Sequence, residues 1–200
     1  MHTVIETLMH EHRVIEQVLD CLEKLASRAG KARKIEAEDA RSIIEVLRNF
    51  ADRCHHGKEE VHLFPLMEAR GFPRDGGPTG TMLHEHDEGR AFIRAMAASL
   101  DDAAAGKKDA LAEFREAAKG YIALLRAHIQ KEDHCLFRMA DEAFSAADQK
   151  KLLEKFAAVE HDVMGPGAHE KYLAMANDLA ERYGVTKAAA PSGHGCGCHH

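Results

Sequence analysis

Apolar residues recur every three or four positions along most of the chain, a spacing that predicts helices rather than strands. Four long helices are expected over 3–28, 38–70, 81–105 and 109–142. Ser145 is a candidate N-cap for a fifth helix over 146–163. A short amphipathic helix should follow the GPG break at 165–167 and end near Tyr183.

The connections between the four long helices are short or rich in glycine and proline, such as GFPRDGGPTG at 71–80. This arrangement predicts an all-α, up-down-up-down four-helix bundle with additional C-terminal helices. We assign 1–142 to the bundle, 143–184 to a helical extension packed on it, and 185–200 to a flexible Cys/His-rich tail.

Composition narrows the class of protein. A net charge of −6 over 200 residues gives no electrostatic reason to expect nucleic acid. No segment approaches the roughly 18 apolar residues of a membrane span, and the N-terminus carries acids and histidines where a signal peptide would be basic and then apolar. We expect a cytoplasmic protein in which Cys21, Cys54 and Cys135 are buried small hydrophobic residues. Its oligomeric state is left open.

The two halves of the predicted bundle repeat. MHEHRVIE at 9–16 resembles LHEHDEGR at 83–90, and HHGKEEVHLF at 55–64 resembles AHIQKEDHCLF at 127–137. Aligned on the shared Leu-Phe, the second pair matches His55 with His128 and Glu59 with Glu132. The helical pattern also turns His12 and His86 inward, because each has apolar neighbours on its own face.

The stretch CHHGKEEVHLFP at 54–65 contains two possible pairs, His55 with Glu59 and His56 with Glu60. Apolar residues precede His55 by one and two helical turns, whereas polar residues precede His56. We therefore predict that His55 and Glu59 face the inside of the bundle, and that His56 and Glu60 lie on the solvated side.

Six inward side chains would then converge from four helices. Burying two carboxylates and four imidazoles without compensation costs several kcal/mol per charge, which a bound metal would offset. Four nitrogens and up to four carboxylate oxygens are too many for one tetrahedral zinc and suit two six-coordinate metals with bridging glutamates. Imidazole and carboxylate without thiolate favour iron or manganese, and zinc or copper stay compatible.

The order H…HxxxE…H…HxxxE resembles the hemerythrin-like, or HHE cation-binding, family over about 5–142. CHHGKEEVHLFP, MLHEHDEGR and LLRAHIQKEDHCLF carry the resemblance. It implies a non-haem diiron centre with His12, His55, His86 and His128 as terminal ligands and Glu59 and Glu132 as bridging ligands. It also implies binding or sensing of O2, NO or related oxidants and, in some members, iron-sulfur repair or peroxide breakdown.

The chain departs from the oxygen-carrying members of that family. Met82 and Arg90 flank His86 where those proteins have a fifth core histidine, and the last pair is His128-x-x-x-Glu132 instead of His-x-x-x-x-Asp. A set of six ligands would leave both metals open, which favours redox chemistry or sensing over simple oxygen storage. His161 is a lower-ranked candidate for a further ligand.

Other residues near the expected site have two interpretations each. Tyr121 could hydrogen-bond a metal-bound oxygen species or simply pack in the core, and His62 could support a ligand. Gly89 could leave room for a small ligand or allow close helix packing. The tail GHGCGCHH at 193–200 could chelate a soft metal or have no function.

We expect a diiron protein that binds a small diatomic or peroxide ligand and acts as a sensor or detoxifier, and enzymatic turnover is left open. The alternative is a metal homeostasis or storage protein whose tail exchanges metal. A third hypothesis is a partner-binding module in which the metal only staples the helices.

Overall fold

The computed structural model describes residues 3–189, and within that range the chain forms helices and no strand. The elements are α1 (Val4–Ala32), α2 (Ala37–Val46), η1 (Leu47–His56), η2 (Glu59–Leu63), α3 (Phe64–Ala69), α4 (Pro78–Ala104), α5 (Lys108–Lys131), η3 (Glu132–Leu136), α6 (Phe137–Ala143), α7 (Ala146–Ala158), η4 (Val159–Val163) and α8 (Ala168–Tyr183). The η segments are π-helical, with hydrogen bonds from residue i to i+5.

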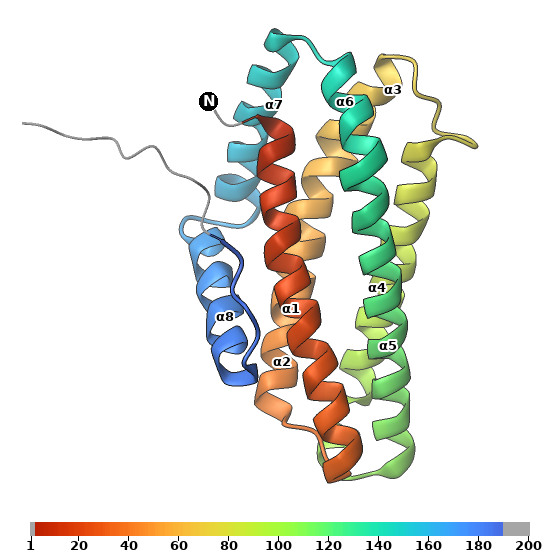
Figure 1. Cartoon of the computed structure of the whole chain (residues 1–200), viewed down its shortest axis with the longest axis vertical. Coiled ribbons are helices and arrows are strands. Elements are labelled where there is room, and N and C mark those ends of the chain that lie inside the picture. The colour runs from red at the N-terminus through yellow and green to blue at the C-terminus, as the bar shows by residue number, and fades with distance from the viewer. Residues whose placement is uncertain (1–2, 190–200) are drawn as a thin grey trace, which may run out of the picture.

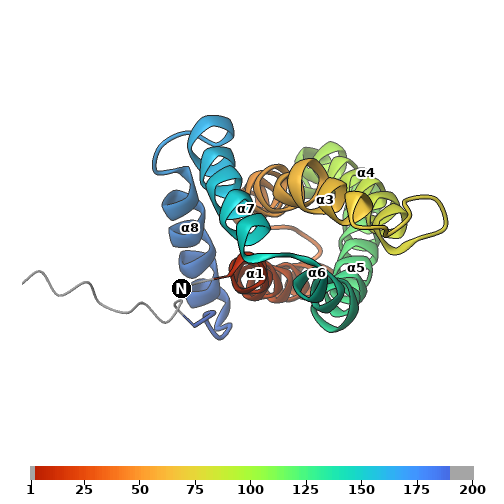
Figure 2. The same cartoon turned by 90° about the horizontal axis from the view of Figure 1, so that it is seen from above.

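Four long helical rods run up and down side by side, as the sequence predicts (Figure 1). They are α1, the continuous run from α2 to α3, α4, and the continuous run from α5 to α6. Seen from above, α7 and α8 lie together on one side of these rods (Figure 2). The all-α bundle with additional C-terminal helices is therefore confirmed.

Local signals in the sequence place the ends of these helices. Thr3 and Glu6 form a capping box in which Thr3 Oγ1 accepts from the Glu6 backbone N–H at 3.1 Å and Glu6 Oε2 accepts from that of Thr3 at 2.8 Å. Ser145 caps α7 in the same way with Asp148, as the sequence predicts. Gly184 has φ of +61° just past α8, a conformation that suits glycine at a helix C-terminus.

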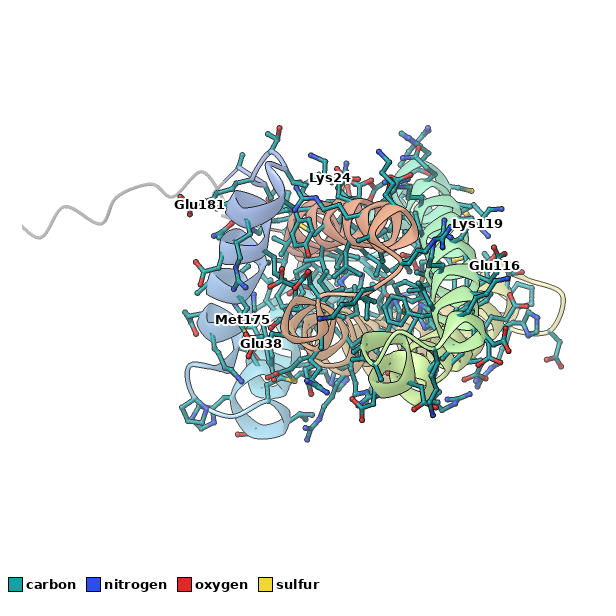
Figure 3. All side chains as sticks on the ribbon, turned by 90° about the horizontal axis from the view of Figure 1, so that it is seen from below. Lys24, Glu38, Glu116, Lys119, Met175 and Glu181 are labelled. Atoms are coloured by element: carbon teal, nitrogen blue, oxygen red, sulfur yellow. The ribbon has the colours of Figure 1, made fainter. Side chains whose placement is uncertain are left out.

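The C-terminal extension, which we define as α7, η4 and α8, packs on α1 and on the first part of the second rod. Gln17 of α1 donates from Nε2 to the Ala176 carbonyl of α8 at 2.8 Å. Side chains fill the spaces between the helices, and Met175 lies among those between α8 and α2 (Figure 3). The second rod is consequently buried on two sides along part of its length.

The buried apolar residues form two clusters at different heights in the bundle. One cluster takes in Leu8 and Met82 at one end, and the other includes Ile15, Ile93 and Leu125. In the first three rods the predicted metal ligands fall in the interval between the two clusters; in the fourth rod Glu132 does so, and His128 directly precedes Ile129 at the edge of the second cluster. A layer of polar side chains thus lies between two layers of apolar ones.

The prediction that all three cysteines of the bundle are buried is wrong for Cys135. Cys21 and Cys54 are buried, but Cys135 is exposed and its Sγ lies 3.7 Å from the sulfur of Met139. The π-helical turn η3 explains the error, because a wider turn delays the inward position by one residue. Leu136 therefore takes the buried position that an uninterrupted α-helix would give to Cys135.

Candidate metal centre

The six side chains predicted to face inward all lie in the polar layer, and each is at most 1% exposed. They come from all four rods: His12, His55, Glu59, His86, His128 and Glu132. Glu132 Oε2 lies 3.2 Å from His12 Nε2 and 3.1 Å from His128 Nε2. Glu59 spans the layer in the same way, with Oε1 3.4 Å from His55 Nε2 and Oε2 3.5 Å from His86 Nε2.

His56 also lies in this layer, which contradicts the prediction that it is solvated. It is only 3% exposed, and its ring stacks on that of His86 with centroids 3.8 Å apart. Because η1 is π-helical, neighbouring side chains diverge less in direction than in an α-helix, and both His55 and His56 can point inward. The polar residue that argued against burial, Asp52, lies one turn earlier with Oδ1 3.5 Å from His56 Nδ1.

The donors form two groups that could each hold a metal ion. One group consists of His56, Glu59, His86 and His128, and the other of His12, His55, Glu59 and Glu132. Within each group the candidate ligand atoms lie within 4.8 Å of one another. Glu59 belongs to both groups, and Glu132 contacts a histidine of each. The arrangement is unequal, since one group has three histidines and the other has two.

Most polar atoms at the centre lack hydrogen-bond partners among the described residues, and the exception is the pair His86 Nε2 and His128 Nε2, which lie 3.1 Å apart. The unpaired atoms are both carboxylate oxygens of Glu59 and of Glu132 and Nε2 of His12 and of His55. Such buried atoms cost several kcal/mol unless something else satisfies them. Imidazole and carboxylate are ligands that iron, manganese and zinc accept, so the residues fit a metal centre.

The pKa values of the two central glutamates are shifted in opposite directions. Burial, with the nearby Glu132 carboxylate, raises the pKa of Glu59 well above its ordinary value. Burial acts the same way on Glu132, but His128 and His12 outweigh it and lower the pKa of Glu132 well below its ordinary value. Without a metal, Glu59 therefore binds a proton more tightly than Glu132 does.

Each of four histidines donates its outer nitrogen to a carboxylate from another rod. His12 Nδ1 donates to Asp133 at 2.7 Å, and His86 Nδ1 donates to Glu60 at the same distance. The other two pairs, each at 2.9 Å, are His55 with Glu11 and His128 with Glu85. Such bonds fix the tautomer and leave Nε2 facing the centre, as in metal sites where carboxylates orient ligating histidines.

A basic side chain balances each of these outer carboxylates. The ion pairs are Arg13 with Asp133, Arg90 with Glu60, Lys58 with Glu11, and Lys131 with Glu85. Arg90 also donates from Nε to Asp52 at 2.8 Å, and so reaches the carboxylate beside His56. From the centre outward, the polar layer thus consists of the candidate metal ligands, the carboxylates that orient the histidines, and the Arg and Lys side chains that pair with those carboxylates.

A family model for the hemerythrin HHE cation-binding domain matches residues 3–140. The chain belongs to this family. The matched region contains the whole polar layer except the contacts made by the C-terminal extension. As a family member, the chain is expected to bind metal through its buried His/Glu groups.

Relatives of this hemerythrin-like chain extend past the family domain. It is 25% identical over 189 residues to the uncharacterized proteins Rv1995 of Mycobacterium tuberculosis and Mb2018 of Mycobacterium bovis. The alignments cover 92% of this chain and 71% of each relative. No solved structure matches the chain significantly.

Several residues singled out from the sequence lie away from the polar layer or outside the described part of the chain. His161 is not among the convergent side chains: its side chain is 72% exposed and its Nδ1 donates to Asp162 at 2.7 Å. His62 lines a surface groove with Leu152 and Lys155. The proposed chelating tail at 193–200 lies outside the described residues.

Tyr121 and Gly89 lie together beside the layer. Tyr121 is 1% exposed, and its hydroxyl has no hydrogen-bond partner among the described residues. A Cβ added to Gly89 would lie 3.5 Å from Tyr121 Cε2, an ordinary contact distance. An alanine would therefore fit at this position, and close packing of α4 on α5 does not by itself require the glycine.

The orienting carboxylates were missed by sequence reasoning, although the repeat contains their signal. Glu11 and Glu85 directly precede the ligand candidates His12 and His86 in both halves. Glu60 and Asp133 likewise follow Glu59 and Glu132 directly, so acids flank both glutamates and histidines at equivalent positions.

Proposed function

We propose that this hemerythrin-like chain holds two iron ions and binds or senses O2, NO or peroxide at the ion beside His12 and His55. The observation that supports it is a set of five buried imidazoles and two buried carboxylates, in which both carboxylates and the Nε2 atoms of His12 and His55 lack hydrogen-bond partners among the described residues. Manganese or zinc could bind the same ligand types.

The residues that would hold one ion are His56, His86, His128 and Glu59, and those that would hold the other are His12, His55, Glu59 and Glu132. An ion in the group with His12 and His55 would have two imidazole ligands instead of three, and we propose this ion as the one that would take the exogenous ligand. When bound, iron would supply redox chemistry and open coordination positions.

The protein itself would position the metal ligands and exclude water from the centre. The orienting carboxylates hold the imidazoles with Nε2 toward the centre, and the apolar clusters keep water away from it on two sides. Phe137 stacks on the His12 ring with centroids 5.2 Å apart and so forms one wall. An apolar wall suits a small uncharged ligand such as O2 or NO.

His56, as a seventh metal donor, favours reversible ligand binding or sensing over oxidant breakdown. The expectation of reactive chemistry depended on a set of six ligands, and His56 enlarges the set by one. We therefore propose reversible binding or sensing as the main function, with oxidant breakdown as a secondary activity of the same centre.

Absorption spectroscopy of aerobically purified, iron-loaded protein tests this function. Charge-transfer bands that change on adding azide, peroxide or NO are expected. A preparation that holds one zinc ion and ignores these molecules would contradict the proposal. Glu132→Gln should lower the metal content, whereas Glu142→Gln, an exposed glutamate on α6, should leave it unchanged.

None of the helices formed by residues 3–189 combines the length and apolar composition needed to cross a bilayer.

A further inference from the structure

Two lysines occupy equivalent places in the internal repeat. Lys58 lies three residues after His55, and Lys131 lies three residues after His128. Each pairs with the carboxylate that orients that histidine, Glu11 in one case and Glu85 in the other. The repeat therefore provides two chains of contacts built from the same residue types.

The two lysines differ in their surroundings. Lys131 has a side chain that is 44% exposed. Lys58 is fully buried, and its ammonium also donates to Glu160 Oε1 at 2.6 Å. Glu160 belongs to η4 and so comes from the C-terminal extension, outside the residues matched by the family model.

Two further residues of the extension reach the same place. The ring of Phe156 lies 5.6 Å from Lys58 Nζ, and His169 Nε2 lies 3.9 Å from Glu11 Oε1. Glu11, Glu160 and His169 are close enough together to hold a cation, and the ammonium of Lys58 already bonds to two of them. The extension thus closes over Lys58 and fixes it from the outside.

We propose that Glu160 is a positioning residue through which the C-terminal extension braces the two-histidine half of the metal centre. Glu160 and Glu11 hold the Lys58 ammonium between them, Glu11 accepts from His55 Nδ1, and His55 faces the centre through Nε2. The three-histidine half has no brace from the extension within residues 3–189, because Lys131 pairs there with Glu85 and Arg90 holds Glu60 from within the bundle. This inference rests on the proposed function.

Metal release to a chromophoric chelator tests the brace in the full chain. Each variant is loaded with two metal ions, and release should occur in two phases. Glu160→Gln keeps the size and the polarity of the side chain but removes its charge, and should speed one phase about 10-fold, the low end for residues that support ligands. The other phase should not change.

Matched variants separate this effect from general changes of charge. Asp162→Asn removes the same charge from the same turn at an exposed position and should leave both phases unchanged. Lys58→Met should speed the same phase as Glu160→Gln, whereas Lys131→Met should have at most about a 2-fold effect, because exposed ion pairs contribute little. The azide-induced spectrum of iron-loaded protein should shift in Glu160→Gln and not in Asp162→Asn.

The outcomes distinguish this inference from the function on which it rests. A wild-type chain that holds no metal would overturn both. A wild-type chain with two metals, and the same release rates and spectra in Glu160→Gln as in Asp162→Asn, would overturn the brace alone. Glu160 is 33% exposed, so its variant should fold even if Lys58→Met does not.

Discussion

The first half of the bundle, 4–69, and the second half, 78–143, repeat one design, and two of the differences between them bear on the metal centre. In the alignment of the two halves, His56 of the first half corresponds to Ile129 of the second, so the first half has one more metal donor. Lys58 is buried under the extension, whereas its counterpart Lys131 is exposed. Both differences lie in the second rod. The His56 imidazole and the extension that covers Lys58 make the two metal positions unequal.

The comparison shows which positions of the repeat make the two donor groups unequal. The donors at equivalent positions provide a nearly even set, with a glutamate from each half between the two metal positions. The additional imidazole lies in the π-helical segment η1, where adjacent side chains diverge less in direction than in an α-helix. The following predictions test how far the two halves differ, in order of decreasing effect.

Removal of both metals should have the largest effect on the fold. If each ion is present at 100 times its Kd, the two together stabilise the chain by about 5 kcal/mol. The metal-free protein should therefore melt roughly 10 to 20 °C below the loaded protein, measured by circular dichroism. Identical melting curves with and without metal would indicate that the polar layer is satisfied by protein and water alone.

Loss of an orienting carboxylate should destabilise the first half more than the second. Glu11→Gln leaves the buried Lys58 with Glu160 as its remaining carboxylate, so urea unfolding of the metal-free protein should show a loss of about 3 kcal/mol. Glu85→Gln, at the equivalent position, removes the partner of the exposed Lys131 and should cost about 1 kcal/mol. Equal losses would contradict the difference between the halves.

Replacement of His56 by its counterpart should make the two halves equivalent. His56→Ile should weaken binding of one of the two metals about 100-fold, at the upper end of what supporting residues contribute, because it removes a donor. Competition with a chelator of known affinity measures this change. His84→Gln, at a side chain that is 76% exposed, serves as the control, and an affinity loss as large in this variant would contradict the role of His56.

Gly89 offers the smallest effect. Its counterpart in the first half is Ile15, a buried residue, so the second half has no side chain at this position. Gly89→Ala should fit against Tyr121 and stabilise the protein by roughly 0.5 to 1 kcal/mol through the unfolded chain. Denaturant unfolding would show this gain with unchanged metal content, and a loss of azide binding would instead show that the glycine keeps room for a ligand.

Much of the fold could be predicted from the sequence. Glycine and proline breaks separate strongly periodic segments, so helix ends such as Ala69, Pro78 and Tyr183 lie within a few residues of their predicted positions. The inward direction of His12, His55, His86 and His128 also follows from periodicity, and all four are buried.

The errors share a physical origin. A strict period of 3.6 residues fails across π-helical turns, which explains why His56 is buried and Cys135 is exposed. Packing of the extension could not be derived from the pattern either. His161 seemed able to reach the bundle from the sequence, but it is its neighbour Glu160 that turns inward to Lys58.

The anomalous difference map of an iron-loaded crystal, recorded at the iron edge, tests the central claim most directly. Two peaks are predicted, one beside His56, His86 and His128 and the other beside His12 and His55, with Glu59 and Glu132 contacting both. A single peak, or two peaks with His56 contacting neither, would contradict an unequal pair of metals set by the first half of the bundle.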